Sequence, residues 1–388
     1  MPRAMIREFL RFETIGGLLL FAAAALALIV ENSPLHVLYD KLLTVPVMVQ
    51  IGEFIIRKPM LLWINDGLMA LFFLLIGLEI KREIFEGQLT TREQISLPVI
   101  AALGGVILPA VIFSFISWTD ADAMQGWAIP VATDIAFALG IISLMGNRIP
   151  ESLKIALMAI AIIDDLVAIV IIALFYTDNL SVTSLGIASI CVVILFTLNR
   201  FRVVSLTPYM LVGIVLWACV LKSGVHSTLA GVILAFFIPL RPRGSTGVSP
   251  LRTLEHNLHP WVAYAILPCF AFANAGVSFA GISLDVFLQP LTLGIAAGLF
   301  FGNQIGVFGL TALGVALKLC KLPEGVGWLQ FYGLSLIMGV GFTMSLFIGT
   351  LAYDDIAHQN AVRLGVLFGS ALSAICGVTV LRVASRNR

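Results

Sequence analysis

Long apolar runs follow one another along the chain, and short polar segments separate them. The runs are about 16–25 residues long, which predicts membrane-spanning helices, because about 20 apolar residues cross a hydrocarbon core roughly 30 Å thick. Barrel strands would instead show alternating segments of about ten residues. Twelve spans are expected, near residues 13–31, 60–80, 95–117, 124–144, 151–176, 182–199, 204–220, 224–240, 255–277, 289–314, 328–351 and 359–383. The pattern predicts an all-α polytopic membrane protein, with one transmembrane domain over residues 1–388 and no separate soluble domain.

The distribution of charge predicts the orientation of these spans. With twelve spans, 18 of the 23 Lys and Arg residues fall on the side that holds both termini, and five fall on the other side. Cytoplasmic loops are rich in Lys and Arg, so both termini are predicted to be cytoplasmic, and we expect a bacterial inner (plasma) membrane. Only 12% of the residues are charged, against 60% hydrophobic. No basic cluster is present that would indicate a nucleic-acid partner.

One loop departs from the helical pattern. Residues 45–58 alternate between apolar and polar positions around Gly52 and Glu53, which predicts an external β-hairpin. The exposed edge of such a hairpin could pair with a second copy of the chain, or the hairpin could lie on its own protein.

Two adjacent carboxylates, Asp164 and Asp165, interrupt the apolar run of the fifth span. Asp164 lies ten residues after Lys154, at about 15 Å from the end of the helix and hence near the middle of the membrane. A carboxylate at that depth is costly and marks a functional site. Consecutive helical positions differ in direction by about 100°, so the two side chains face different neighbours.

Two spans carry signals of a broken helix. Pro130 interrupts the fourth span just before Thr133 and Asp134, and residues 339–343 interrupt the eleventh. These breaks lie at matching places in two possible repeats, residues 95–176 and 289–383. We therefore expect inverted repeats with two discontinuous helices that cross near the middle of the membrane, as in many transporter sites.

The chemistry expected at this site is exchange of a cation for protons. Carboxylate, hydroxyl and carbonyl oxygens bind hard cations such as Na⁺, and protons compete for the same carboxylates. Two alternatives remain. A Na⁺-coupled organic anion transporter would need a cationic contact for its substrate, and the middle of the membrane holds none. An intramembrane aspartyl protease would place its two Asp residues on different helices, whereas here they are adjacent.

Several stretches resemble the NhaA-type bacterial sodium/proton antiporters, and the similarity covers nearly the whole chain. The matching stretches are residues 62–66 (LWIND), 77–83 (GLEIKRE), 127–138 (WAIPVATDIAFA), 161–165 (AIIDD), 221–226 (LKSGVH), 254–261 (LEHNLHPW), 270–276 (FAFANAG) and 341–345 (GFTMS). The resemblance implies a secondary antiporter, not an enzyme, that extrudes Na⁺ or Li⁺ in exchange for protons, supports pH homeostasis and uses no cofactor. It also implies pH regulation and a homodimer formed through the external hairpin.

The resemblance further implies roles for individual residues. Asp165 is the primary cation ligand, Asp164 is its partner in proton exchange, and Thr133 and Asp134 belong to the crossing of the broken helices. The cytoplasmic pH-sensing cluster of the family matches Glu79, Arg82, Glu255, His256 and His259. From the residues alone, a solvated loop is the favoured interpretation of the segment before the ninth span, and Glu79 reads as a residue at the membrane interface.

One position departs from the family pattern. Members usually carry a lysine in the tenth span that pairs with the first carboxylate of the Asp pair, and here that position is Asn303. We expect Asn303 to donate a hydrogen bond to Asp164 in place of the lysine. The sequence leaves open whether one or two protons are exchanged for each cation.

Overall fold

The computed structural model describes residues 3–52, 54–87, 92–177, 180–241, 249–280 and 284–386. Eight helical segments within this part are long and apolar enough to cross a membrane: Thr14–Glu31, Met60–Glu86, Ile95–Ile116, Glu151–Phe175, Val182–Arg200, Pro290–Ala316, Trp328–Ala352 and Ile356–Arg386. Two shorter apolar segments are Ile129–Leu144 and Leu206–Leu221. The chain is therefore an all-α multi-span membrane protein.

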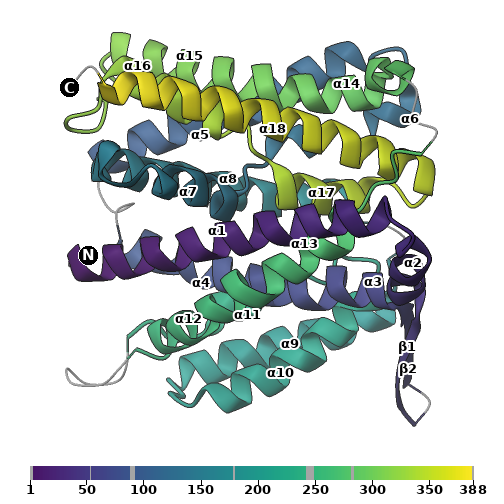
Figure 1. The fold of residues 1–388 in the computed structure, drawn as a ribbon. Coiled ribbons are helices and arrows are strands. Elements are labelled where there is room, and N and C mark those ends of the chain that lie inside the picture. The colour runs from purple at the N-terminus through teal and green to yellow at the C-terminus, as the bar shows by residue number, and fades with distance from the viewer. Residues whose placement is uncertain are drawn as a thin grey trace.

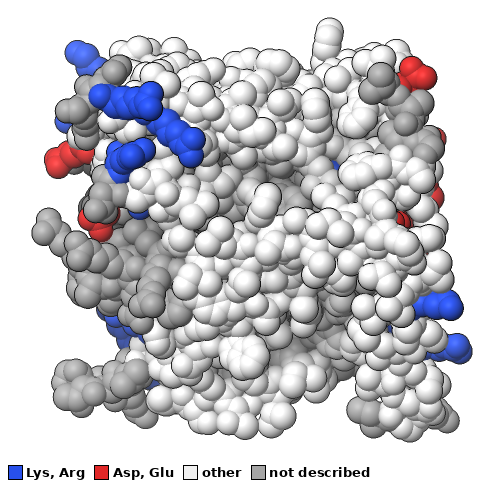
Figure 2. Space-filling view, viewed as in Figure 1, with Lys and Arg blue, Asp and Glu red and all other residues white. Residues whose placement is uncertain are grey.

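The outer surface has the polarity of a protein embedded in lipid. Large apolar side chains such as Phe115 (83% exposed) and Val182 (83% exposed) point outward from the helices. Figure 2 shows charged side chains gathered at the two ends of the molecule, with a broad uncharged belt between them. Such a belt matches a hydrocarbon layer, because apolar side chains can face lipid without a free-energy cost, whereas charged side chains cannot.

The helices form two groups that run side by side (Figure 1). The first group contains α5 (Arg92–Ile116), α6 (Ala121–Met124), α7 (Ile135–Leu144), α8 (Glu151–Phe175), α14 (Pro290–Ala297), α15 (Asn303–Ala316), α16 (Trp328–Ile337), α17 (Phe342–Ala352) and α18 (Ile356–Arg386). The second group contains α1 (Arg3–Glu31), α2 (His36–Thr44), α3 (Met60–Trp63), α4 (Met69–Glu86), α9 (Val182–Arg200), α10 (Leu206–Leu221), α11 (Leu229–Phe237), α12 (Pro250–Trp261) and α13 (Leu267–Ala275). The first group thus combines two stretches of chain that are more than one hundred residues apart.

The two-stranded hairpin forms where the alternating pattern predicts it. Strand β1 (Pro46–Ile51) pairs antiparallel with β2 (Phe54–Pro59), with Pro46 opposite Pro59 and Ile51 opposite Phe54. Gly52 follows β1 with φ of +61°, a backbone conformation that glycine adopts without steric cost. The hairpin lies at the end of the molecule opposite both chain termini (Figure 1).

Two helices of the first group are interrupted inside the protein. A short 3-10 turn (Ile129–Val131) precedes three non-helical residues, and α7 begins only at Ile135. The second interruption separates α16, which ends at Ile337, from α17, which begins at Phe342. Pro130 lacks the backbone N–H that a continuing helix would need, and Gly339 and Gly341 sit where any Cβ would meet neighbouring atoms. Proline and close packing therefore explain the two breaks.

Glycines bring α5 and α15 into close contact. A Cβ built on Gly306 would overlap the backbone carbonyl of Gly104, and a Cβ on Gly104 would overlap that of Gly306. Gly298 and Gly302, on the same face of the tenth span, lie against Pro130 and Pro109. Small residues at these positions let two helices approach at backbone distance, as is common in membranes. This contact holds the two sequence-distant halves of the first group together.

Candidate ion-binding site

Asp164 lies inside α8 and is joined to the first helix break. Its side chain is only 2% exposed, and its Oδ2 accepts a hydrogen bond of 2.8 Å from the backbone N–H of Thr133. The Thr133 hydroxyl in turn donates to the carbonyl of Met338, at 2.9 Å, beside the second break. A continuous helix would use that N–H internally, so the interruption before α7 is what makes it available to the carboxylate.

Asp134 links the two interrupted helices to each other. Its Oδ1 accepts from the backbone N–H of Phe137 at 2.9 Å, which caps the N-terminus of α7. Its Oδ2 accepts from the backbone N–H of Thr343 at 2.9 Å and also from the Thr343 hydroxyl, at the N-terminus of α17. Its own N–H donates to the carbonyl of Val340 at 2.8 Å. One carboxylate therefore lies at the positive ends of two helices, where negative charge is stabilised.

Asp165 has a different environment from its neighbour. It is 3% exposed, and its Oδ1 has no hydrogen-bond partner within the described residues. The ionisable groups that act on it electrostatically are Asp164, Glu79 and Asp134, all of them acidic. A buried carboxylate oxygen without a donor is rare in folded proteins, and such an oxygen is available to a cation or a proton. Among the described residues no three His, Cys, Asp or Glu side chains gather around one metal position, so any ion here would rest on the Asp pair and on other oxygens.

Asn303 does not take the place that the sequence predicted for it. The side chain is fully buried, and its Nδ2 lies 3.4 Å from the carbonyls of Pro130 and Leu299, not against Asp164. Its Oδ1 has no hydrogen-bond partner in the described part of the chain. The predicted Asn303–Asp164 hydrogen bond is therefore wrong. An asparagine side chain is shorter than a lysine, and its amide ends near the carbonyl of Pro130 in the 3-10 turn. Oδ2 of Asp164 accepts from the backbone N–H of Thr133 instead.

Comparison with known proteins decides the family. A family model described as "Na+/H+ antiporter 1" matches residues 7–381. The chain belongs to this Na⁺/H⁺ antiporter family. It is 57% identical over 387 residues to the Na(+)/H(+) antiporter NhaA of Pseudomonas putida strain GB-1, covering 99% of each chain. It is 56% identical over 384 residues to NhaA 1 of Syntrophotalea carbinolica (99% of this chain, 97% of the relative) and 55% identical over 395 residues to NhaA of Rhodospirillum rubrum (100% and 99%). The predicted resemblance is confirmed, and the protein is a transporter, which removes the protease alternative.

The antiporter's predicted pH-sensing residues are only partly brought together. The Nε of Arg82 on α4 lies 3.0 Å from Oε1 of Glu255 on α12. The Nη2 of the same guanidinium lies 2.9 Å from Oε1 of Glu83. His259 is buried and acts electrostatically on Glu255, whereas His256 is exposed. The segment around Glu255 and His259 belongs to helix α12, which packs against α4. The alternative of a solvated loop is therefore wrong, although the His256 side chain is exposed.

Glu79 is half-buried and lies inside α4, not at its end. Helix α4 continues to Glu86, beyond the predicted end at residue 80, and Lys81, Arg82 and Glu83 are buried. The buried ammonium group of Lys81 is hydrogen-bonded: its Nζ donates to the carbonyls of Phe236 (2.7 Å) and Ile238 (2.5 Å) at the end of α11. The neighbouring helix therefore supplies the partners that let charged residues extend the span.

Sequence reasoning missed two residues of the antiporter's site region. Thr343 was placed at a break but not in the site, although it gives Asp134 two hydrogen bonds. Glu83 was not singled out, although it shares Arg82 with Glu255. A Thr at the second position of a helix after a break is a signal that could have suggested a partner for a carboxylate.

Proposed function

We propose that this Na⁺/H⁺ antiporter binds Na⁺ or Li⁺ at Asp165 and Asp164, and that protons replace the cation on the same two carboxylates. Asp165 is the primary ligand. Thr133 and Asp134 position the site, and the helix breaks that they occupy are the crossing point of two discontinuous helices in inverted repeats over residues 95–176 and 289–383. Alternating access then exposes the Asp pair to one side of the membrane at a time.

The observation that carries this proposal is the buried Oδ1 of Asp165, which has no hydrogen-bond partner among the described residues. Among the described residues, the ionisable groups that act on it electrostatically are all acidic, so none of them supplies a stabilising positive charge. In that position the ionised carboxylate is stable only with a bound cation. When the cation leaves, the carboxylate must bind a proton and become neutral. A side chain that binds either a cation or a proton, but not both, meets the minimal requirement for exchanging the two.

A transport assay tests the assignment directly. Purified protein in liposomes should show Na⁺-dependent proton flux, read with a pH-sensitive dye inside the vesicles. Asp165→Asn should abolish this flux and leave the protein folded. Asp122→Asn is the matched control, because Asp122 is an exposed carboxylate on α6, and it should transport normally. Flux retained in Asp165→Asn would contradict the assignment.

The exchange is proposed to be electrogenic, with two protons for one cation. No lysine among the described residues acts electrostatically on the Asp pair, and the matching position is Asn303, which contacts the carbonyls of Pro130 and Leu299 instead. Two buried adjacent carboxylates without a counter-charge are too costly to stay ionised, so both bind protons when the cation leaves. Na⁺ efflux from liposomes should therefore respond to an imposed membrane potential, and a rate independent of potential would mean one proton per cation.

The assembly and the regulation follow the family in this proposal. Twelve spans place both termini in the cytoplasm of the bacterial inner membrane, and the hairpin on the opposite side joins two copies. Replacing residues 46–59 by a short Gly-Ser linker should then convert the dimer into a monomer, which light scattering would detect.

The regulation is proposed to depend on a pH sensor that consists of Glu79, Arg82, Glu255, His256 and His259. Arg82→Gln leaves the partly buried Glu255 without its ion pair to Arg82 and should shift the pH profile of transport, whereas an unchanged profile would exclude this sensor.

A further inference from the structure

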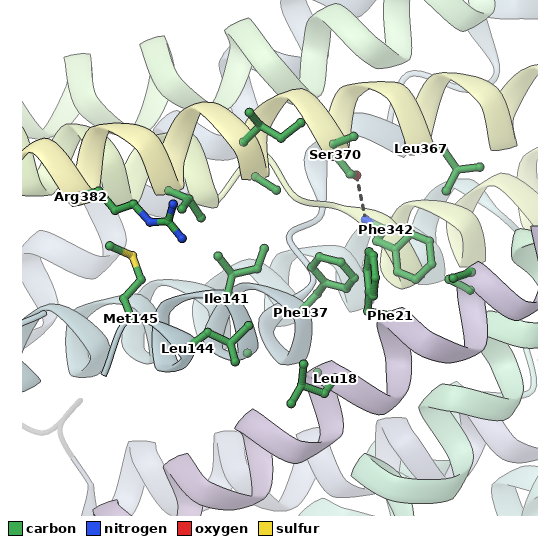
Figure 3. A pocket seen from close by; sticks show the side chains of 18 of the residues that line it. Leu18, Phe21, Phe137, Ile141, Leu144, Met145, Phe342, Leu367, Ser370 and Arg382 are labelled. Atoms are coloured by element: carbon green, nitrogen blue, oxygen red, sulfur yellow. Dashed lines mark hydrogen bonds between the residues drawn. The ribbon is translucent and has the colours of Figure 1, made fainter. Parts of the chain in front are cut away.

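A groove separates α1 from α18 along the seam between the two helix groups (Figure 3). Its volume is about 980 Å³, and its lining comes from α1 on one side and from α7 and α18 on the other. Figure 3 shows α1, in purple, diverging from α18, in yellow, toward the end of the groove that Met145 and Arg382 mark. This end lies on the side of the molecule that holds both chain termini (Figure 1). On that side, α18 is therefore held away from α1.

The two groups meet closely at the opposite end, where the hairpin lies. Arg363 of α18, Thr350 of α17 and Asn274 of α13 line a small cavity there. The cavity has a volume of about 10 Å³, which holds one water molecule at most. A hydrated ion cannot enter a space of this size, so the seam is closed at this point in the conformation described here.

A hydrogen bond from Arg363 joins the two helix groups at the closed end of the seam. Its Nη1 donates to the carbonyl of Gly276, the residue after α13, at 3.1 Å, and to Oδ1 of Asn360 at 3.2 Å. The Gly276 carbonyl lies at the negative end of the α13 dipole, where a cation is stabilised. Ring pairs such as Phe270 with Phe347 (centroids 6.1 Å apart) also join the groups, but apolar contact has no preferred direction. The charge-assisted hydrogen bond is directional, so it breaks when α18 moves by a small distance.

The second group holds the acceptor of this hydrogen bond in a fixed position. The Tyr39 hydroxyl of α2 donates to the carbonyl of Phe272 at 2.5 Å, and the two rings pack edge to face with centroids 5.2 Å apart. A Cβ at Gly276 would lie 2.5 Å from the Tyr39 hydroxyl oxygen, so only glycine fits between α2 and the end of α13. Asn32, just after α1, donates to the carbonyl of Val277 at 2.8 Å. Because α1 and α2 fix the Gly276 carbonyl in these ways, α18 is the element that moves when the bond breaks.

Acidic side chains of the second group attract Arg363 as well. Glu31 is the last residue of α1 and Asp40 lies on α2, and both act electrostatically on the guanidinium. The Oε2 of Glu31 is buried and has no hydrogen-bond partner among the described residues. A buried carboxylate oxygen without a donor is stabilised by a nearby positive charge. Glu31 therefore favours the position of α18 in which Arg363 approaches the second group.

We propose that Arg363 is a positioning residue of the exchange reaction, which latches α18 to the second helix group on the hairpin side of the membrane. The inference rests on the proposed alternating access, in which the two groups move relative to each other. The latch is closed in the conformation described here, while the groove on the opposite side is open. Opening of the hairpin side takes Arg363 away from Gly276 and Glu31, and the groove then narrows. Arg363 thus sets the equilibrium between two conformations through the position of α18 and not by binding the cation.

Thiol labelling of the full-length protein in lipid nanodiscs tests the latch without any transport measurement. Thr350→Cys reports on the hairpin side and Met145→Cys on the groove, in a parent protein whose five cysteines are replaced by alanine. Arg363→Met should raise the labelling rate of Thr350→Cys on the order of tenfold, because loss of one hydrogen bond to a charged group shifts an equilibrium by about that factor. The rate at Met145→Cys should fall in the same variant, because the groove narrows as the hairpin side opens.

Two further variants and a pair of reagents separate the latch from a general effect of charge. Glu31→Gln keeps the hydrogen bond of Arg363 and removes one acidic group, so it should raise the Thr350→Cys rate less than Arg363→Met does. Arg57→Met removes the same side chain from an exposed position of β2, outside the seam, and should label like the parent protein. Anionic and cationic thiosulfonate reagents should show the same acceleration in Arg363→Met, since an open seam admits both. Loss of positive charge without opening would accelerate only the cationic reagent.

Three results would overturn the proposal. The first is an unchanged Thr350→Cys rate in Arg363→Met, and the second is acceleration with the cationic reagent alone. The third is faster labelling of both Thr350→Cys and Met145→Cys, which would mean a loosened protein and not a shift between two conformations. Labelling reads the conformation and not ion flux, so failure of the latch is distinct from failure of the proposed exchange at Asp165.

Discussion

The two carboxylates Asp134 and Asp165 should respond in opposite ways when each is replaced by asparagine. Both are buried and both lie near the helix breaks, so a loss of transport would not distinguish them. Their hydrogen bonds do. Asp134 accepts from the backbone N–H groups of Phe137 and Thr343, whereas the Oδ1 of Asp165 accepts from none of the described residues.

The cost of Asp134→Asn follows from these contacts. An asparagine keeps one acceptor oxygen and turns an NH₂ group toward the other donor, so one of the two buried backbone N–H groups loses its partner. That loss costs about 1–3 kcal/mol. Removing the charge from the N-termini of α7 and α17 adds about 0.3–1 kcal/mol at each. The free energy of unfolding should therefore fall by roughly 2–5 kcal/mol, or about 4–10 °C in the unfolding midpoint at about 2 °C per kcal/mol.

Asp165→Asn removes one charge from a cluster of acidic groups and breaks no hydrogen bond to Oδ1, so its unfolding midpoint should stay the same or rise. Thermal unfolding in detergent can be followed with a thiol-reactive dye, because Cys191 and Cys320 are buried until the protein unfolds. Equal midpoints for the two variants, or a lower midpoint for Asp165→Asn, would refute the division into a structural and an ion-binding carboxylate.

Three further predictions use the same unfolding assay. Thr343→Val removes only the hydroxyl bond to Asp134 and should lower stability by about 1 kcal/mol, less than Asp134→Asn, and a larger loss would mean that the hydroxyl holds more than this carboxylate. Gly306→Val should lower the free energy of unfolding by about 1–3 kcal/mol or more, because its Cβ would overlap the backbone of α5. Gly309→Ala is the control: nothing lies within 4 Å of a Cβ built there, so this variant should be slightly more stable than wild type. The reverse order of stabilities would contradict the close contact of the two helices. Burial raises the pKa of Tyr39, in α2 outside the spans, from 10.0 to about 12, so the stability from its neutral phenol is complete below pH 10 and is lost as the pH rises through about 12. The alkaline loss of stability should be shallower in Tyr39→Phe, and identical pH profiles would exclude this contribution.

The long apolar helices and the hairpin could be read from the sequence because each depends on local pattern. A helix in lipid must satisfy its own backbone, so an apolar run of sufficient length determines both the element and its surroundings. The depth of Asp164 and Asp165 follows from counting along one such run. The breaks could also be located, because Pro130 and the glycines of residues 339–341 are visible in the sequence as residues that interrupt a helix, although the contacts of Gly339 and Gly341 come from other segments.

The partners of the charged residues could not be read in the same way. Local pattern places Asp134 at a break, but only the fold brings the N-terminus of α17 to the same carboxylate, across 209 residues of sequence. The sequence assigned Asn303 to Asp164, and the fold places it against the carbonyl of Pro130. Likewise, Arg82 and Glu255 lie on helices whose packing no local pattern specifies.

The sequence by itself thus determined the membrane topology class, the carboxylate pair and the positions where two helices break. Those features depend on the free energy of burying backbone and charge in lipid, which each segment meets largely alone. Only the tertiary structure decided which carboxylate caps two helices and which one is left without a donor. That distinction depends on distances between segments, and a hydrogen bond is lost with a displacement of about 1 Å.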